Sequence, residues 1–357
     1  MKAFLILEDG TTFTGTSIGS TKEVISEIVC NTSMTGYLGI LTDPAYAGQA
    51  VAMTYPLIGN CGICYEDMES SKTWLDGFIV RELSRIPSNF RSEDTIQNFL
   101  EKNDITGIAG IDTRALTKIL REKGAMKGMI TTNENFNLEE ILPKLKSHVT
   151  GNLVNKVTCS EKKVIPGEGK KVALMDFGAK NSTIKSLTDL GCQVTVYPAG
   201  TKAEEIIADA PDGIMLSGGP GDPKDCGEII EEVKKLSETN IPIFATGLGH
   251  QLMALANGAD TYKMQYGHRG ANHPVKDLET GRVYISSQNH GYVVDVDKMA
   301  PEVAEVRFVN VNDGTNEGLK YKNKNILTVQ FLPEGYPGLQ ECESLFERFI
   351  KMMEVTE

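Results

Sequence analysis

Strand-like and helix-like segments alternate through the second half of the chain, and this alternation restricts the fold more than any other feature of the sequence. The apolar strand-like runs lie at 171–177, 193–199, 213–217 and 241–245, and the helical patterns lie at 181–190, at 228–238 and from about residue 250 onward. Repeated βα units build a parallel sheet covered by helices on both faces, and such sheets bind ligands at the carboxyl ends of their strands. The pattern therefore predicts an α/β fold with a flavodoxin-like doubly wound parallel sheet over residues 171–357.

The first half of the chain is less regular. Short strand-like runs at 3–7, 50–54 and 77–80 lie among many turns. A helix is predicted over 113–123, with Asp112 as its N-cap and Gly124 as its stop. We expect an α+β module over residues 1–150. The segment 151–170 collects Gly, Pro and Lys without sustained periodicity, which predicts a linker.

Composition restricts the partners of the chain. The 36 Lys and Arg residues against 48 Asp and Glu residues give a net charge of −12, which disfavours nucleic acid and anionic membranes as partners. No apolar run approaches the roughly 20 residues that span a bilayer. We therefore expect a cytoplasmic protein whose partners are small molecules or other proteins.

Cysteine usage indicates reduced, mostly buried thiols. The seven cysteines are an odd number and lie mainly within apolar strings. Cys61 and Cys64 form a single C-x-x-C, and a structural zinc site needs four ligands. No metal site is predicted.

The segment 241–258 has the layout of a nucleophile elbow. An apolar strand enters a glycine-rich turn that opens directly into a helix, so one side chain would be presented at the helix N-terminus. The residue at that position is Gly247, which has no side chain. Further loops at 217–223, 287–292 and 329–335 follow strand-like runs and could surround the same pocket. No G-x-x-x-x-G-K-[ST] loop for nucleotide phosphates occurs.

Several longer strings carry a family resemblance. They are LEDGTTFTG, TDPAYAGQ, MTYPLIGNCGI and GIAGIDTRALTKILREKGAMKG in the first half, and MDFGAKNS, SGGPGDP, GLGHQLMALANGA, YGHRGANHPV and SSQNHGYVVD in the second. With these strings the chain resembles the small subunits of carbamoyl phosphate synthetase, whose C-terminal half is a class I glutamine amidotransferase. The resemblance implies hydrolysis of glutamine to supply ammonia for carbamoyl phosphate synthesis from bicarbonate and ATP, feeding pyrimidine and arginine biosynthesis. It also implies a large-subunit partner that holds ATP and Mg, and no cofactor in this chain.

Three positions depart from the family pattern. The elbow of the family reads G-I-C-L-G-H-Q with a nucleophilic cysteine, where this chain has Gly247. The late motif of the family reads Q-F-H-P-E, in which the histidine is the base and the glutamate orients it. This chain has Leu332 in place of the histidine and, of these two catalytic residues, keeps only Glu334. The family's pocket-lining serine in D-P-S-Y is Ala45 here. The remaining glutamine-binding and oxyanion positions match, and they are Gly219, Gly221, Leu248, Gln251, Asn289, Gly291 and Tyr292.

These departures predict a chain without glutaminase activity. Glutamine hydrolysis needs a thiolate, a base and oxyanion donors, and loss of the nucleophile alone costs a factor of about 10⁶ in rate in triad hydrolases. We expect a structural or regulatory partner of an ammonia-using large subunit, with Glu334 as a vestige of the triad and L-glutamine bound at most without turnover. Two alternatives stay open: a working amidotransferase with an atypical nucleophile, for which Cys226 and Thr246 are the candidates, or a repurposed glutamine-sensing or scaffold protein. His250 and His290 are expected to have a structural or pocket-lining role rather than to replace the base.

Overall fold

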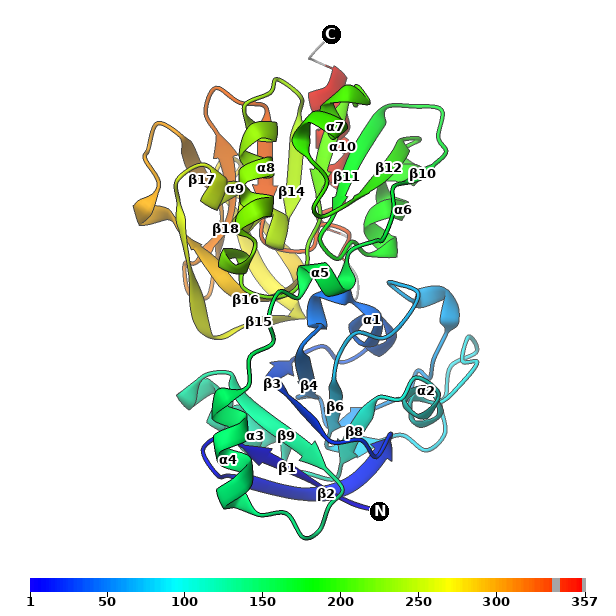
Figure 1. Ribbon diagram of the computed structural model, residues 1–357. Coiled ribbons are helices and arrows are strands. Elements are labelled where there is room, and N and C mark those ends of the chain that lie inside the picture. Colours follow the sequence, from blue (N-terminus) through cyan, green and yellow to red (C-terminus); the bar gives the residue numbers. More distant parts are fainter. Residues whose placement is uncertain (336–340, 355–357) are drawn as a thin grey trace. The chain divides into compact units, whose positions relative to one another are not determined.

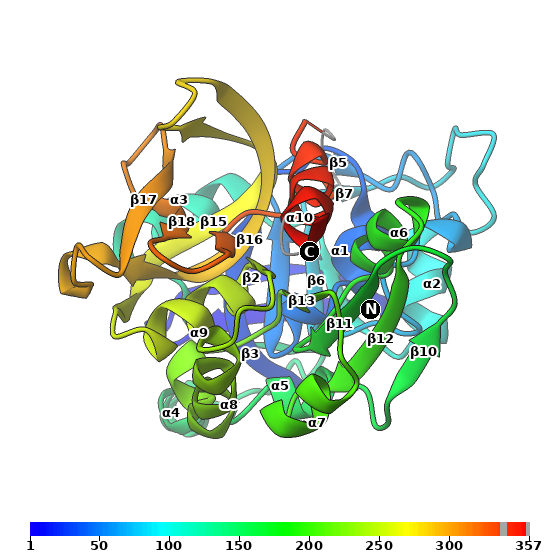
Figure 2. The same ribbon diagram turned by 90° about the horizontal axis from the view of Figure 1, so that it is seen from above.

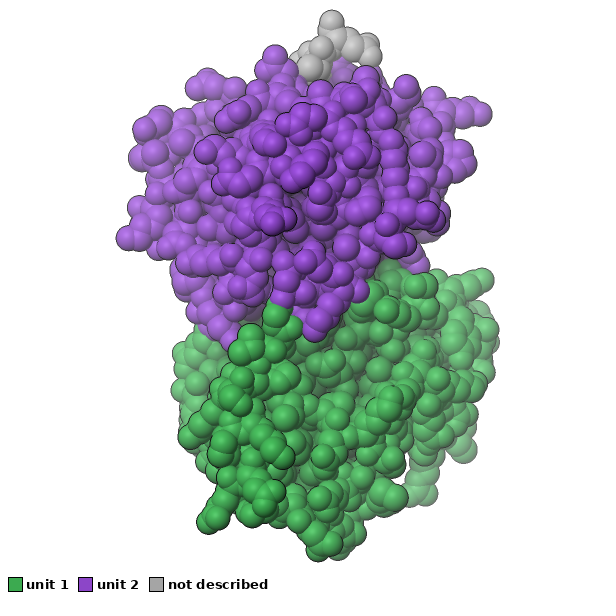
Figure 3. All heavy atoms as spheres, in the orientation of Figure 1, with its two compact units in different colours: residues 1–151, 265–269 green, residues 152–264, 270–357 purple. Residues whose placement is uncertain are grey.

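A computed structural model describes residues 1–335 and 341–354. The chain forms two compact units. Unit 1 comprises residues 1–151 and 265–269, and unit 2 comprises residues 152–264 and 270–357 (Figure 3). None of the helices within the described ranges is both long enough and apolar enough to cross a membrane.

Unit 1 is built on a closed barrel with the strand order β1-β2-β8-β6-β4-β3-β9. The barrel strands are β1 (Lys2–Leu7), β2 (Thr12–Gly19), β3 (Val24–Asn31), β4 (Gln49–Met53), β6 (Gly77–Val80), β8 (Thr106–Ala109) and β9 (Met126–Thr131). The other elements are β5 (Leu57–Ile58), β7 (Glu82–Leu83), α1 (Tyr37–Thr42), η1 (Pro44–Tyr46), η2 (Tyr65–Asp67), α2 (Ile96–Lys102), α3 (Thr113–Lys123) and α4 (Leu138–Ser147) (Figure 1).

The predicted helix at 113–123 is confirmed, together with both of its ends. The Asp112 side chain accepts a hydrogen bond from the N–H of Ala115, which satisfies one of the free donors of the first turn. Gly124 ends the helix at φ +95°, a conformation that side chains rarely adopt. The match between predicted and observed bounds indicates that these caps decide where α3 begins and ends.

A short segment from the second half of the sequence completes unit 1. The side chain of Gln265 donates from Nε2 to the carbonyls of Arg121 and Glu122, at 3.1 and 2.9 Å, in the last turn of α3. Its own carbonyl accepts from the N–H of Ala125 at 2.7 Å. The last carbonyl groups of a helix have no N–H partner within the helix, and Gln265 supplies the missing donor for two of them in α3.

Unit 2 contains a 10-stranded sheet with the order β10-β12-β11-β13-β14-β19-β18-β17-β15-β16. The strands are β10 (Lys163–Ile165), β11 (Lys171–Asp176), β12 (Gln193–Pro198), β13 (Gly213–Leu216), β14 (Ile243–Thr246), β15 (Asp260–Asp277), β16 (Val283–Asp295), β17 (Ala304–Asn310), β18 (Asn316–Tyr321) and β19 (Ile326–Val329). The helices are α5 (Val154–Val157), α6 (Asn181–Asp189), α7 (Ala203–Ala208), η3 (Pro223–Asp225), α8 (Gly227–Ser237), α9 (Leu248–Ala256), η4 (Val296–Lys298) and α10 (Ser344–Glu354).

The central strands of this sheet are parallel and their two faces are covered by different helices. Strands β12, β11, β13, β14 and β19 pair in parallel, and β18 and β17 continue the sheet antiparallel. One face packs on α7, α8 and α9 and the other on α6 and α10, with alternate strand residues entering each core (Figure 2). The α/β fold with a doubly wound parallel sheet after an α+β module is confirmed.

The segment 151–170, predicted to be a linker, is folded as part of unit 2. Leu153, Val154 and Val157 are buried, and β10 pairs antiparallel with β12. The N–H of Cys159 donates to the carboxylate of Asp176 at 2.7 Å. This segment packs through a few buried side chains and through glycines that lie close to other backbone, not through one regular apolar face. Its sequence therefore shows no hydrophobic periodicity.

Candidate functional site

Three loops of unit 2 follow neighbouring parallel strands at their carboxyl ends. The loop after β13 begins at Ser217, the loop after β14 is Gly247, and the loop after β19 begins at Gln330. The strands are adjacent in the order β13-β14-β19, so these loops meet at one edge of the sheet. This is the edge where the sequence predicted functional residues.

Gly247 has the backbone of an elbow. It connects β14 directly to α9 with φ +51° and ψ −114°, and its N–H donates to the carbonyl of Val329 at 3.0 Å. A Cβ added there would lie 3.3 Å from the Cα of Gly218 and 3.9 Å from the carbonyl oxygen of Gln330. The turn therefore holds the conformation in which other residues present a side chain, and leaves nearly enough space for one.

The glycine loop after β13 is held against the first turn of α9. The N–H of Gly249 donates to the carbonyl of Ser217 at 3.0 Å, and a Cβ at Gly249 would lie only 2.6 Å from the carbonyl oxygen of Leu216. A Cβ at Gly219 would lie 2.3 Å from the carbonyl oxygen of Phe177. Glycine is required at both positions because backbone approaches backbone there.

The predicted oxyanion donors are available in this arrangement. Within residues 1–335 and 341–354, no backbone acceptor takes a hydrogen bond from the N–H of Leu248 or of Gly219. Leu248 is the first residue of α9, whose N-terminal N–H groups carry the positive end of the helix dipole. The site can therefore bind an oxygen acceptor, but the elbow offers no atom that attacks it.

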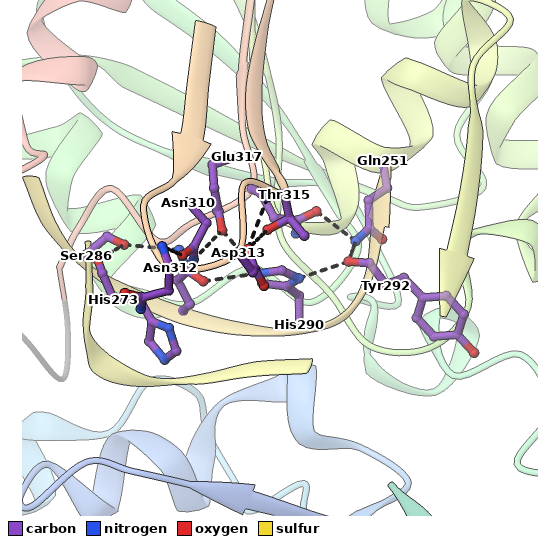
Figure 4. Close-up of polar contacts among 12 residues, drawn as sticks. Gln251, His273, Ser286, His290, Tyr292, Asn310, Asn312, Asp313, Thr315 and Glu317 are labelled. Atoms are coloured by element: carbon purple, nitrogen blue, oxygen red, sulfur yellow. Dashed lines mark hydrogen bonds and ion pairs between the residues drawn. The ribbon is translucent and has the colours of Figure 1, made fainter. Parts of the chain in front are cut away.

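Gln251 connects α9 to β16. Its Nε2 donates to the carbonyl of Tyr292 at 2.8 Å (Figure 4). The same nitrogen donates to Oε1 of Gln330 at 2.9 Å. Asn289 and Gly291 lie on the same strand as Tyr292. The structure thus brings these four predicted glutamine-binding residues to α9 and β16, although the expectation of a loop at 287–292 is wrong, because those residues lie within a strand.

Glu334 is paired with a lysine that the sequence analysis missed. Its Oε1 lies 2.7 Å from Nζ of Lys180, and the side chains of Lys180 and Glu334 are only 6% and 3% exposed. The hydroxyl of Thr183 donates to the same carboxylate at 3.4 Å. The string MDFGAKNS after β11 contains Lys180, but nothing in its spacing connects it to a carboxylate 154 residues further along the chain.

Leu332 stands where the resemblance implies a histidine base, and backbone hydrogen bonds hold its segment. Its N–H donates to the carbonyl of Ser287 at 2.9 Å, and its carbonyl accepts from the N–H of Gly335 at 3.1 Å. The segment is therefore fixed through its backbone to β16. The side chain of Leu332 can neither accept nor donate a proton.

The two histidines near this edge are engaged in structural contacts. His250 is fully buried in α9 with Nδ1 2.7 Å from the hydroxyl of Thr328, and burial lowers the pKa of this histidine to about 3. Nδ1 of His290 lies 2.9 Å from the carbonyl of Tyr292 (Figure 4), and its Nε2 lies 3.3 Å from Oε1 of Gln288. Burial separates the His250 ring from any substrate, and both ring nitrogens of His290 already have oxygen partners, so neither histidine is placed as a general base.

The candidate replacement nucleophiles are buried. Cys226 is 3% exposed, and burial raises the pKa of its thiol to about 12. Thr246 is buried within β14. A thiol with a raised pKa holds its proton at neutral pH, so Cys226 is a poor nucleophile.

The remaining predicted site residues lie apart from these contacts. Gly221 is exposed at φ +93°, with the side chain of Leu153 3.6 Å from where a Cβ would lie. Ala45 belongs to unit 1, where its N–H donates to the Asp43 carboxylate at 2.8 Å at the start of η1. Cys61 of the C-x-x-C is also in unit 1, with Sγ 3.5 Å from the hydroxyl of Thr35.

A buried histidine–carboxylate contact joins His290 of β16 to Glu317 of β18. Nε2 of His290 lies 4.0 Å from Oε1 of Glu317, and that oxygen also accepts from Nδ2 of Asn310 at 3.1 Å. Both ring nitrogens of His290 already have oxygen partners within hydrogen-bond distance. These contacts join β16, β17 and β18 in a buried polar network.

Comparison with known proteins agrees with this architecture. Residues 5–130 match the model of the carbamoyl-phosphate synthase small chain, CPSase domain, and residues 173–352 match glutamine amidotransferase class-I. Three relatives are named as small chains of carbamoyl phosphate synthase. The protein of Clostridium perfringens is 51% identical over 98% of this chain and 99% of its own length, that of Listeria monocytogenes is 48% identical over 99% and 97%, and the pyrimidine-specific small chain of Bacillus subtilis is 46% identical over 100% and 97%.

A solved structure was also matched, a glutamine amidotransferase of Thermotoga maritima, at 17% identity and a TM-score of 0.40 over 53% of this chain and 86% of that chain. The family models and the sequence relatives together cover both units. On that ground the chain belongs to the family of carbamoyl-phosphate synthase small chains, proteins whose name implies a large-subunit partner.

Proposed function

We propose that this chain is a small subunit that supports carbamoyl phosphate synthesis without hydrolysing glutamine. It would bind and stabilise or regulate a large subunit that uses bicarbonate, ATP and free ammonia, for pyrimidine and arginine biosynthesis in the cytoplasm. The observation that carries the proposal is the elbow at Gly247, which keeps its backbone conformation and its oxyanion donors but has no side chain. ATP and Mg would be bound by the large subunit.

The missing groups account for the expected loss of rate. Amide hydrolysis needs a nucleophile at the elbow and a base beside it, and these positions hold Gly247 and Leu332. Triad members act as a unit, so loss of the nucleophile costs a factor of about 10⁶ and loss of the base adds little further. The remaining carboxylate, Glu334, is paired with Lys180, which supports its role as a structural anchor of the loop after β19.

Glutamine binding without turnover is part of the proposal. Gln251 and Tyr292 are held together by a hydrogen bond, and the N–H groups of Leu248 and Gly219 remain available to a ligand oxygen. Binding needs these groups, whereas hydrolysis needs the two that are absent. These residues therefore support the binding of glutamine but not its hydrolysis.

The alternative of an atypical nucleophile is disfavoured by burial. Cys226 lies in the core between α8 and the sheet, and its thiol has a pKa raised to about 12. Thr246 is a buried strand residue, and the nearby His250 directs its Nδ1 to the hydroxyl of Thr328 instead. A repurposed glutamine-sensing or scaffold protein would differ in having no productive effect on a large subunit.

One experiment separates these three functions. The purified chain is combined with its large subunit, then supplied with amide-¹⁵N glutamine together with unlabelled ammonium, and carbamoyl phosphate is analysed by mass spectrometry. We expect unlabelled product and an ammonia-driven rate that rises when this chain is added. Label in the product would refute the proposal in favour of a working amidotransferase. Absence of any binding or stimulation would favour the scaffold function instead.

A further inference from the structure

Residues 84–92 of unit 1, called the Phe90 loop below, expose large apolar side chains to solvent. Phe90 is 98% exposed and Ile86 is 81% exposed. A phenylalanine this exposed adds almost nothing to the core of its own unit. Single exposed apolar residues are common on protein surfaces, so exposure alone assigns no role to this loop. The hydrogen bonds that hold the loop supply the further observation.

Backbone hydrogen bonds hold the Phe90 loop to β5 and to the residues that follow it. The N–H of Ser84 donates to the carbonyl of Ile58 at 2.7 Å. The N–H of Ser88 donates to the carbonyl of Asn60, also at 2.7 Å. These bonds extend the two-stranded sheet of β5 and β7, which is separate from the barrel. The first half of the loop is therefore fixed by its backbone.

Phe90 itself lies at the tip of a turn that is closed on both sides. The N–H of Ser92 donates to the carbonyl of Asn89 at 3.0 Å, and the N–H of Arg91 donates to the side-chain oxygen of Asn89 at 3.1 Å. The guanidinium of Arg91 pairs with the carboxylate of Asp67, with Nη2 2.7 Å from Oδ1 and Nη1 3.3 Å from Oδ2. Two hydrogen bonds to one carboxylate fix the direction of the arginine. The turn therefore holds Phe90 in one outward position.

An exposed aromatic ring on an ordered loop has the properties of an interface anchor. Ordering a loop costs conformational entropy, and here polar contacts within unit 1 already offset that cost. A partner that buried Phe90 would gain the hydrophobic free energy of a large side chain without having to order the loop. Aromatic residues are among the residue types in which the binding energy of protein interfaces concentrates.

The surface around the loop adds further apolar area and a positive charge. Leu57 and Tyr65, on the segment that pairs with the loop, are 37% and 39% exposed. Arg85 is exposed and has no ion-pair partner in the described part of the chain. The whole chain has a net charge of −12, so two copies of it repel each other. This surface therefore fits a different protein that offers an apolar pocket with a carboxylate beside it.

The position of the loop in the chain indicates which protein that is. The loop lies within the part that matches the small-chain domain of carbamoyl-phosphate synthase, and outside the part that matches class I glutamine amidotransferases. A surface needed for contact with a large subunit is expected in the first of these parts, because the second is shared with amidotransferases in general.

We propose that the Phe90 loop docks into an apolar pocket of the large subunit. Phe90 is the central anchor, Arg85 faces a carboxylate at the rim of the pocket, and Arg91 is a positioning residue that holds the turn. The inference rests on the proposed function, because it assumes that this chain binds a large subunit.

Surface plasmon resonance between the full-length chain and its purified large subunit tests the anchor. We expect Phe90→Ala to raise the Kd at least about 30-fold, the effect of truncating a central anchor at an interface. The matched control is Val149→Ala, which truncates an apolar side chain of 82% exposure elsewhere in unit 1 and should leave the Kd unchanged. Both variants should melt with the unchanged chain, because neither side chain packs in a core.

Two further variants test the arginines. Arg91→Ala keeps the Phe90 ring but frees the turn, so the Kd should rise about threefold to tenfold. Arg85→Glu places a negative charge against the carboxylate of the partner, so association should slow, and the effect should be larger at low salt. An association rate for Arg85→Glu that stays unchanged at low salt would refute the carboxylate at the rim.

The outcomes separate the inference from the proposed function. An unchanged Kd for Phe90→Ala would overturn the inference and leave the binding of a large subunit intact. If the unchanged chain does not bind the large subunit, the proposed function and the inference both fail. Sedimentation velocity of the chain alone covers self-association. A dimer that Phe90→Ala dissociates, with an unchanged affinity for the large subunit, would assign the loop to a contact between copies and refute the inference.

Discussion

Replacement of Gly247 by alanine tests whether the elbow holds its backbone in the conformation described above. Gly247 has φ +51° and ψ −114°, a region where a residue with a side chain costs ~1–3 kcal/mol. The added Cβ would also lie 3.3 Å from the Cα of Gly218. Alanine restricts the unfolded chain and returns ~0.4–1 kcal/mol. The net expectation is a loss of ~1–2 kcal/mol in the free energy of unfolding.

Unfolding in urea and differential scanning calorimetry provide the measurement. For a domain of about 150–250 residues, ~1 kcal/mol shifts the melting temperature by ~2–4 °C, so Gly247→Ala should melt ~2–8 °C lower. The matched control is Gly200→Ala, an exposed position where an added Cβ meets no atom within 4 Å. This control should change the melting temperature little or raise it slightly. If both variants melt together, the elbow is not strained and the reasoning fails.

Three other changes test the buried groups. Lys180→Met leaves the Glu334 carboxylate buried without its cation and should lower the free energy of unfolding, measured in urea, by ~3–5 kcal/mol. The double variant Lys180→Met with Glu334→Leu should regain most of this free energy. If the single and double variants lose the same amount, the two side chains are not coupled. Gly247→Cys with Leu332→His should restore measurable ammonia release from glutamine, and continued inactivity of the folded double variant would show that the pocket is damaged elsewhere. Burial lowers the pKa of His250 to about 3, so below pH ~6.5 the unfolded chain binds a proton at this residue that the folded chain does not bind. The free energy of unfolding should therefore fall by up to ~1.4 kcal/mol per pH unit as the pH is lowered from there. His250→Asn should remove this pH dependence, and an unchanged dependence would refute its assignment to His250.

Much of unit 2 could be predicted because its periodicity is local. The apolar runs and helical stripes between residues 171 and 256 correspond to β11, α6, β12, β13, α8, β14 and α9 within a few residues. Buried parallel strands need continuous apolar residues, and their covering helices need one apolar face, so both leave a mark in the sequence. The position of the elbow at Gly247 followed from that alternation.

The contacts that decide the chemistry were not predictable in the same way. The pairing of Lys180 with Glu334 joins the ends of β11 and β19, which are not neighbours in the sheet. The strand β16 runs through 287–292, where Asn, Gly and Ser residues indicated a loop, because pairing within the large sheet overrides local turn preference. Most of the barrel in unit 1 was also missed, since its short strands show little alternation.

The five residues Gln265–Arg269 have a consequence for how this protein can be divided. A fragment that ends at residue 151 contains every barrel strand but not the glutamine whose amide reaches the carbonyls of Arg121 and Glu122. The same fragment loses the partner of the Ala125 N–H. A gene split after residue 151 would therefore deliver a first product whose α3 ends without these contacts.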